Sequence, residues 1–287
     1  MRFFWFLFLI SFCFSGVFFS IEDNFYVSNI DAKSFLVEKI TELDAEINWT
    51  TGTIRVFTTV PYTSQKENIG KFYDEIQNSV NRELYLKLSR AIGLIRLSDP
   101  FLVKDYYQSY PDIRYELSSY LEKTIYYPMV KKEKGAYGIA ELPLFGEKGI
   151  VNIFFKDIPR KEVTNYIDES KDLEYFDTLI IDMIVHKEFN PSIGLRIYDE
   201  DGTLLYGPET VNPEVFKKEG LCIYTKNLAY AFSSVRTGKR IFYTIPAKVK
   251  GQFNTDIVLF NADARRLFAS KRSLKYINNC KVIIVKP

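Results

Sequence analysis

An apolar block at the N-terminus limits how this chain folds, because it separates a leader from the part that can form domains. A single charge at Arg2 is followed by a phenylalanine-rich run up to Phe14, and the small residues Ser15 and Gly16 come next. A charge, an apolar stretch and small residues in this order are typical of a secretory signal peptide. We therefore expect export, with a signal peptide over residues 1–15, or alternatively over 1–20.

Two other fates of this leader stay open. Cys13 could carry a lipid, although the bulky Phe12 stands where that processing requires a small residue. Without cleavage, the apolar run extends to Phe19 and is about as long as the shortest membrane-spanning helices. Cleavage is the favoured outcome, and it predicts a periplasmic protein secreted across the inner membrane. Peripheral membrane contact would then require an uncleaved or lipidated N-terminus.

Charge and cysteine content narrow the classes of partner. The net charge is +2 and no stretch concentrates basic residues, so nucleic acid is not an expected partner. Outside the leader the chain has two cysteines, Cys222 and Cys280. They could form one disulfide, but a chain of this length does not depend on such a staple. Two buried free thiols are the favoured interpretation.

Residues 30–155 are predicted to form a first α+β domain. Apolar residues at helical spacing predict a helix over 30–47, and the alternating segment Thr53–Val60 predicts a strand. The longest helix signal ends near Gly93. It has Ser64 and Glu67 as a capping box and an apolar stripe along one face.

The rest of the first domain is predicted to be one or two short helices and a meander. The short helices lie over 101–119, with a break near Pro111. The strands are expected over 120–131, 136–144 and 150–155. A long helix that buries one face on an antiparallel sheet is an α+β arrangement.

A charged segment, 156–175, is the predicted linker to a second α+β domain over 176–287. Asp201-Gly202 is a strong turn signal between two short strands, and Pro213 can open a helix. The expected elements are strands 178–185, 195–198, 203–206, 221–225, 241–250, 256–260 and 281–285, with helices from Asn212 and from Asn261 or Asp263. The predicted fold class is therefore α+β: two small domains, each an antiparallel or mixed sheet packed against helices, after an N-terminal signal peptide.

No residue is predicted to be catalytic, cofactor-binding or metal-ligating. His186 is the one histidine of the chain, so a catalytic triad or a histidine-rich metal site lacks its raw material. The acidic stretch Asp199–Gly202 does not have the ligand spacing of a calcium loop, since its glycine is fourth rather than sixth. The chain is thus expected not to be an enzyme and to use no cofactor.

A run of tyrosines is the clearest sign of a binding surface. Seven of them crowd a short stretch: Tyr106, Tyr107, Tyr110, Tyr115, Tyr120, Tyr126 and Tyr127. Tyrosine is enriched at protein interfaces, whereas in a core its hydroxyl usually lies at the rim. Both interpretations stay open for the run as a whole. Tyr106, Tyr107 and Tyr110 are the candidate partner-contact residues.

Several segments carry a family resemblance. Trp49–Val56, Leu88–Gly93 and Glu141–Gly146 resemble the LPP20-type lipoproteins of bacterial envelopes. The same module is similar to the N-terminal domain of the T-type flagellar assembly protein, which builds a ring around the periplasmic motor. Further segments resemble the tail domain of uncharacterised LPP20-like proteins, among them Leu179–Asp182, Arg196–Gly202, Asp256–Ala264 and Cys280–Val285. The resemblance is loose over 49–155 and closer over 178–286.

The resemblance implies a fold more than an activity, because its motifs are turns and packing positions. The long helix departs from the alanine-rich pattern of relatives, and the lipobox is poor. The expected function is that of a non-enzymatic periplasmic envelope protein that assembles with other envelope or flagellar motor proteins, as a ring or collar assembly factor in its sharpest version. The alternative is a periplasmic binding or transport-associated domain for a small molecule or glycan.

Overall fold

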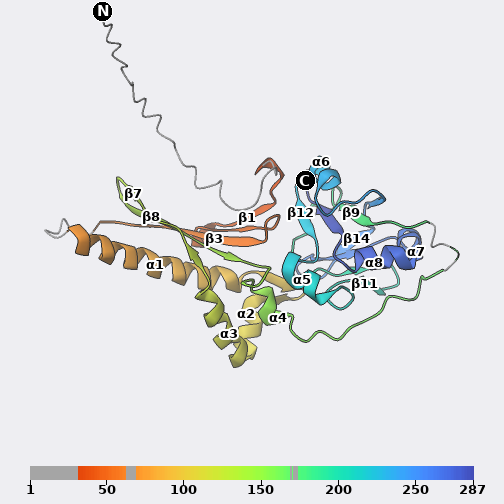
Figure 1. Ribbon diagram of the computed structural model, residues 1–287, viewed down its shortest axis with the longest axis horizontal. Helices are drawn as coiled ribbons and strands as arrows, with labels where there is room; N and C mark the ends of the chain where they lie inside the picture. The colour runs from red at the N-terminus through yellow and green to blue at the C-terminus, as the bar shows by residue number, and fades with distance from the viewer. Residues whose placement is uncertain (1–31, 63–68, 169, 171–173) are drawn as a thin grey trace, which may run out of the picture. The chain divides into compact units, whose positions relative to one another are not determined.

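The computed structural model describes residues 32–62, 69–168, 170 and 174–287 (Figure 1). The predicted signal peptide and the capping box of the long helix lie outside these residues. The described chain mixes helices with antiparallel and parallel strands, which confirms the predicted α+β class. Among the described residues no helix is long and apolar enough to cross a membrane.

The first sheet is antiparallel and has the order β1-β2-β3-β8-β6, with β7 also paired to β8. Its strands are β1 (Val37–Ile40), β2 (Ala45–Asn48), β3 (Thr53–Val60), β6 (Ile125–Tyr126), β7 (Val130–Lys132) and β8 (Gly135–Pro143). The predicted strands 53–60 and 136–144 are confirmed. The predicted strand 120–131 is wrong as one element, because β6 and β7 are separate and the helix α3 extends to Leu121.

The predicted helix over 30–47 is wrong in its described part. The chain forms the short 3-10 helices η1 (Ala32–Ser34) and η2 (Thr41–Leu43), and β1 and β2 pair as a hairpin around η2. Asp44 takes a left-handed conformation at φ 45° and ends η2. Ala45 and Ile47 then alternate into the core. A hairpin with a helical turn places apolar residues at the same intervals as a helix, so spacing alone did not separate the two.

The long helix α1 (Ile69–Gly93) packs along one face of this sheet, as predicted (Figure 1). Its buried stripe consists of Ile76, Val80, Leu84, Leu88, Ala91 and Ile92. The partners on the sheet are small: Ala136, Gly138 and Ala140 of β8 all face the helix side and are buried. Small residues on the strand let the helix lie close to the sheet.

The connection after α1 contains two short helices, where one or two were expected from the sequence. After β4 (Arg96–Ser98) and β5 (Phe101–Leu102) come α2 (Val103–Ser109) and α3 (Pro111–Leu121), with the break at Tyr110. The predicted strand 150–155 is wrong, because α4 (Val151–Phe154) forms there. The Asn152 side chain donates to the carbonyls of Gly146 and Gly149, which closes a helical turn and not an extended strand.

Two further sheets form the C-terminal half. The parallel sheet has the order β12-β16-β9-β13 and the mixed sheet has the order β11-β10-β15-β14. Their strands are β9 (Thr178–Asp182), β10 (Ile197–Tyr198), β11 (Leu204–Tyr206), β12 (Ile223–Thr225), β13 (Ile241–Thr244), β14 (Lys248–Lys250), β15 (Asp256–Val258) and β16 (Val282–Val285). Each lies within a predicted strand segment, but the predicted strand 241–250 is wrong as one element: β13 and β14 belong to different sheets, and Pro246 between them has no amide hydrogen to donate. Gly202 (φ +85°) lies in the β10–β11 turn.

Helices pack against these sheets. They are α5 (Pro213–Glu219), α6 (Leu228–Ser233), α7 (Asn261–Phe268) and α8 (Lys271–Ile277). The helices α5 and α7 confirm the two that were predicted, whereas α6 and α8 were not predicted. Both start at a side-chain cap that the sequence shows: Asn227 accepts from the Tyr230 amide and Ser270 from the Arg272 amide.

The segment predicted as a linker contacts the C-terminal half over much of its described length. Val163 is buried, the Lys161 amide donates to the Glu209 carbonyl at 2.9 Å, and the Asp168 amide donates to the Ala269 carbonyl at 2.9 Å. Just before this segment the rings of Phe155 and Phe216 meet edge to face at 5.1 Å. Buried residues of both halves form one continuous hydrophobic cluster. The division into two domains stays a prediction.

Candidate functional site

The tyrosine-rich region is built on α2, and the backbone around α2 is firmly anchored. The Leu102 amide donates to the Asp105 carboxylate at 2.7 Å, which caps the first turn of the helix. The Val103 amide donates to the Ile95 carbonyl at 2.9 Å, which ties the helix to the segment after α1. Val103 is fully buried. Side chains on the outer face of α2 are therefore presented from a fixed base.

Four aromatic rings meet on this base, and we call them the α2 aromatic surface: Phe101, Tyr106, Tyr110 and Phe154. The Tyr106 ring is the centre of the group. Its centroid lies 5.6 Å from that of Phe101, 5.9 Å from that of Phe154 and 6.1 Å from that of Tyr110. Tyr106 is half-buried, whereas Phe101 is 45% exposed and Tyr110 is 56% exposed. The surface thus has a packed centre and two open rings.

The structure separates the three tyrosines that the sequence singled out. Tyr106 and Tyr110 lie together in the α2 aromatic surface. Tyr107 packs elsewhere: its hydroxyl lies where a side chain at Gly93 would stand, 2.7 Å from an ideal Cβ position. Within the same run, Tyr120 and Tyr126 pack against the core, and Tyr115 is largely exposed. The run therefore divides into rings that pack against the core and rings that are exposed.

Two members of the α2 aromatic surface were not predicted from the sequence. Phe101 follows the Asp99-Pro100 turn, and Phe154 lies in the segment that was predicted to be a strand. Burial over 151–155 alternates residue by residue, so even the predicted strand would have placed Phe154 on the face opposite the buried Val151 and Ile153.

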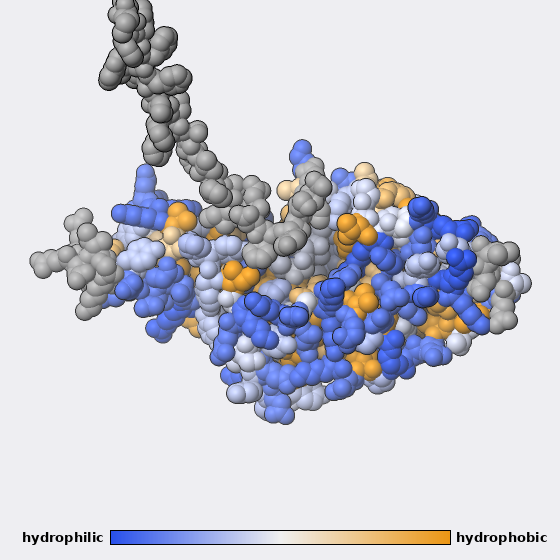
Figure 2. All heavy atoms as spheres, in the orientation of Figure 1, coloured by the Kyte–Doolittle hydropathy of each residue, from blue (hydrophilic) through white to orange (hydrophobic). Residues whose placement is uncertain are grey.

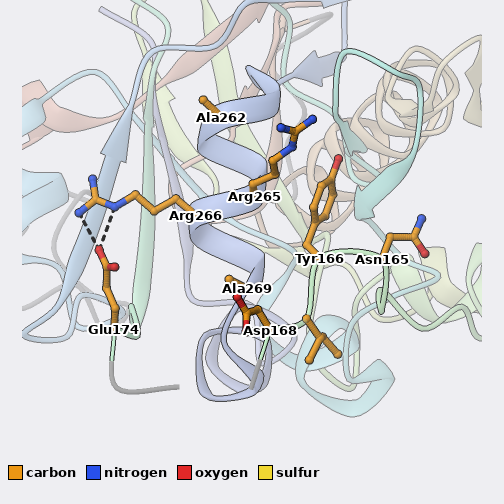
Figure 3. Close-up of a pocket in the computed structure, with 9 residues that line it drawn as sticks. Asn165, Tyr166, Asp168, Glu174, Ala262, Arg265, Arg266 and Ala269 are labelled. Carbon is orange, nitrogen blue, oxygen red and sulfur yellow. Dashed lines mark hydrogen bonds and ion pairs between the residues drawn. The ribbon is translucent and has the colours of Figure 1, made fainter. Parts of the chain in front are cut away.

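A groove beside α7 is a second candidate site (Figure 3). It has a volume of about 670 Å³ and lies between the segment 165–168 and α7. Its lining residues are Asn165, Tyr166, Ile167, Asp168, Glu174, Ala262, Arg265, Arg266 and Ala269. The predicted linker 156–175 supplies one wall of this groove. A groove was not expected there, because the segment was predicted to be a connector.

The polar groups of the groove are already engaged with one another. The Tyr166 hydroxyl donates to the Asp199 carboxylate at 2.6 Å. Burial, together with this hydrogen bond, raises the pKa of Tyr166 to about 12. Arg266 turns toward Glu174, with N–O distances of 3.0 and 2.9 Å, while Arg265 lies beside Tyr166 (Figure 3). Among the described residues that line the groove, no pair of side chains has the arrangement of a catalytic acid and base.

His186 and the acidic turn have structural partners. The His186 Nε2 lies 3.0 Å from the Pro246 carbonyl oxygen and Nδ1 lies 3.2 Å from the Glu188 carboxylate. Asp199 accepts from the Thr203 amide at 2.7 Å as well as from Tyr166, so its carboxylate closes the β10–β11 turn. In the described part of the chain no three His, Cys, Asp or Glu side chains converge as a metal site.

Surface hydropathy is mixed on the face seen in Figure 2. Apolar residues form small separate groups among hydrophilic ones on this face.

The comparisons with known proteins concern the C-terminal half. No curated protein matches the chain. The family model of the second domain of Treponema pallidum Tp0624 matches residues 178–287, so the chain is similar to that domain from the start of β9 to its last residue.

Proposed function

We propose that this chain is an exported, non-enzymatic envelope protein that works by assembly with other proteins through the α2 aromatic surface. The observation that carries the proposal is the packed group of Phe101, Tyr106, Tyr110 and Phe154, two of whose rings are open to a partner. Aromatic residues are enriched at the centres of protein interfaces.

The rigidity of the α2 aromatic surface favours binding. Tyr106 is held between neighbouring rings, and α2 itself is capped by Asp105. Ordering a side chain at an interface costs about 0.5–1.5 kcal/mol, and a ring that is already held avoids most of this cost. Two residues after Phe154, Lys156 donates to both carboxylate oxygens of Glu116 at 2.6 Å. A polar rim around aromatic anchors is the usual composition of such interfaces.

The cellular setting is part of the same proposal. The leader supports a periplasmic location, and the LPP20-type resemblance supports a role in the envelope. The sharpest version is a factor of the flagellar motor ring or collar, which rests on the similarity to the T-type assembly module. Fold-level similarity supports such a role by analogy alone.

Site-specific photocrosslinking tests the assembly proposal. A photoreactive phenylalanine analogue replaces Tyr110 in one strain and Tyr73 of α1 in the control strain; the two side chains are 56% and 53% exposed. We expect a discrete crosslinked band in living cells from position 110 and none from position 73. Equal crosslinking at both positions, or none at either, contradicts the proposal.

Deletion followed by imaging of motors in place tests the flagellar version. We expect an incomplete ring and impaired swimming. Intact rings and normal motility would exclude the flagellar role and leave envelope assembly to be judged by the crosslinks.

A small-molecule or glycan-binding domain is the second candidate, and the groove beside α7 favours it. Its volume of about 670 Å³ suits a ligand of a few rings. The Arg265→Glu variant would reverse the charge beside Tyr166. If the groove binds an anionic glycan, this variant should abolish binding to immobilised glycans while leaving the Tyr110 crosslink intact.

A further inference from the structure

A second surface, remote in sequence from α2, combines two arginines with one tyrosine. The guanidinium carbon of Arg272 lies 3.7 Å from the centre of the Tyr175 ring, and that of Arg240 lies 4.2 Å from the same centre. Both distances are within the range of a strong cation–π contact. We call these three residues the Arg–Tyr clamp.

The parallel sheet brings the clamp together. β9 and β13 are neighbours in register, with Thr178 opposite Ile241, so the residues just before each strand lie at the same end of the sheet. The Asp177 amide donates to the Arg240 carbonyl at 2.9 Å. On the other side, the Phe176 amide donates to the Ser273 hydroxyl of α8 at 2.9 Å. Tyr175 is therefore held between the start of β13 and the first turn of α8.

The neighbouring carboxylates are directed elsewhere. Asp177 accepts from the backbone amides of Lys239 and Arg240, at 3.0 to 3.2 Å. Glu174 pairs with Arg266. Within the described ranges no ion pair joins a carboxylate to the guanidinium of Arg240 or Arg272. Two like charges thus share one ring, and each lacks a described counter-charge.

Stacking on a ring fixes a guanidinium and leaves its N–H edge free. A planar guanidinium on an aromatic face presents its donors outward, in the fork geometry that matches a carboxylate. Both arginines are exposed, so this edge is open to solvent. The mutual repulsion of the two charges falls when an anion lies beside them. The clamp is therefore arranged to receive oxyanions.

We propose that the Arg–Tyr clamp binds the carboxylates of an acidic segment of a partner protein. The frame around it favours a protein over a lipid surface: Tyr276 of α8 stacks near Tyr175 at 6.1 Å, and tyrosine and arginine are the residue types that dominate protein hot spots. Tyr276 is the only exposed large aromatic or apolar side chain among described residues 174–177 and 271–277. This surface is separate from the α2 aromatic surface, and the inference goes beyond the proposed function.

A titration with a defined acidic peptide tests the clamp. A fluorescent oligoglutamate peptide is titrated with the whole protein, purified after any processing of its N-terminus in the cell. Oligoglutamine is the uncharged reference. We expect oligoglutamate to bind and oligoglutamine not to bind, and the affinity for oligoglutamate should fall as salt is added. The double variant Arg240→Gln/Arg272→Gln should weaken binding by about tenfold or more.

A charge-matched control separates the clamp from net charge. The variant Arg82→Gln/Arg90→Gln removes two exposed arginines of α1 and should leave oligoglutamate affinity within about twofold of the wild type, since distant exposed charges are screened. Tyr175→Leu keeps both arginines and removes their platform, and it should weaken binding by several-fold. Circular dichroism establishes that each variant is folded, and the Tyr110 crosslink in each variant reports independently on the assembly proposal.

The competing sources of oxyanions are arms of the same titration. Inorganic phosphate and vesicles of phosphatidylglycerol are each added in place of the peptide. Clamp-dependent binding of phosphate or vesicles in the absence of oligoglutamate binding overturns the proposal, and so does an equal loss in the α1 control variant.

Discussion

At the scale of single residues, Asp256 of β15 is held in an environment that opposes its charge. Asp256 is 7% exposed, and its Oδ1 has no hydrogen-bond partner among the described groups. Burial is the largest cause that raises the pKa of this carboxyl to about 6, and Asp99 adds to it while Arg196 opposes it. The ionised form is therefore costly in the folded state.

The Asp256→Asn variant should be more stable than the wild type at neutral pH. Because the folded pKa lies above that of the unfolded chain, Asp256 contributes stability below the unfolded pKa and loses it as pH rises through about 6. We expect a gain of about 1–3 kcal/mol in unfolding free energy near pH 7 and little gain near pH 4. Urea unfolding at both pH values measures it. A gain that is the same at both would show that the titration of Asp256 is not its cause.

Cys222 and Cys280 are both buried and free, as the sequence favoured. Burial raises the pKa of Cys222 to about 12 and that of Cys280 to about 11, so the reactive thiolate is scarce in the folded protein. We expect neither to react with maleimide in the native protein and both to react in denaturant without reductant. If labelling required a reductant, the pair would be a disulfide.

At the scale of elements, the contact between α1 and β8 depends on the absence of a side chain at Gly138. A Cβ there would lie 2.3 Å from Cγ1 of Val80 and 3.1 Å from Cδ1 of Leu84. Valine is branched at Cβ and has few rotamers within a helix, so Val80 cannot turn away. The distance between helix and sheet is thus set by one residue on each element.

The Gly138→Ala variant should therefore be destabilised, by about 1–3 kcal/mol from overpacking. Val80→Ala alone should also lose about 1–3 kcal/mol through a cavity. The double variant removes both faults, because the new methyl occupies part of the space that Val80 leaves. Its loss should be smaller than the sum of the two single losses by about 1 kcal/mol or more, as measured by chemical denaturation. Strictly additive losses would mean that the two residues are not in contact.

Elements with a long, unambiguous period could be predicted, and those with a short period could not. α1 and β3 follow single periods over many residues, and the Asp201-Gly202 turn has its own chemistry. In 32–47 the hairpin places its apolar residues at helical intervals, and 150–155 is too short for spacing to separate a strand from a helix. α6 and α8 are also short, and the caps at Asn227 and Ser270 were their only local signal.

The candidate sites divide in the same way. Tyr106 and Tyr110 are close in sequence, so their clustering could be expected from composition. Tyr175, Arg240 and Arg272 are far apart in the chain, and they meet because β9, β13 and α8 do. No local pattern marks such a group, because its members become neighbours only through the topology of the parallel sheet.

At the scale of the whole described molecule, the two predicted domains share a tight contact around Trp49. Trp49 is almost fully buried, and its ring meets that of Tyr224 edge to face at 5.9 Å. The Thr50 hydroxyl donates to the Tyr224 carbonyl at 2.6 Å, and the Thr225 hydroxyl donates to the Ser34 carbonyl at 2.8 Å. The hairpin of β1 and β2 is thereby bonded to the edge of the parallel sheet at β12.

This contact predicts that both halves unfold in one step. A core that continues across the halves leaves neither with a complete core of its own, and cooperative units usually coincide with such cores. Trp49 is the one tryptophan outside the predicted leader, so its fluorescence reports on the contact between the halves. In a Trp5→Phe chain, the urea transition seen by Trp49 fluorescence should coincide with that seen by far-ultraviolet circular dichroism.

A substitution in one half should then move both signals. Leu84→Asp buries an unpaired carboxylate under the first sheet, at a cost of several kcal/mol, and should lower both midpoints together. The exposed Glu83→Asp change on the same helix is the matched control and should leave both midpoints near the wild-type values. If the halves were independent domains, circular dichroism would keep a second transition at the original midpoint, carried by the strands and helices of residues 178–287. Coincident shifts would instead mean that the chain from Ala32 onward folds as one unit, with the segment 156–175 as part of its packed structure.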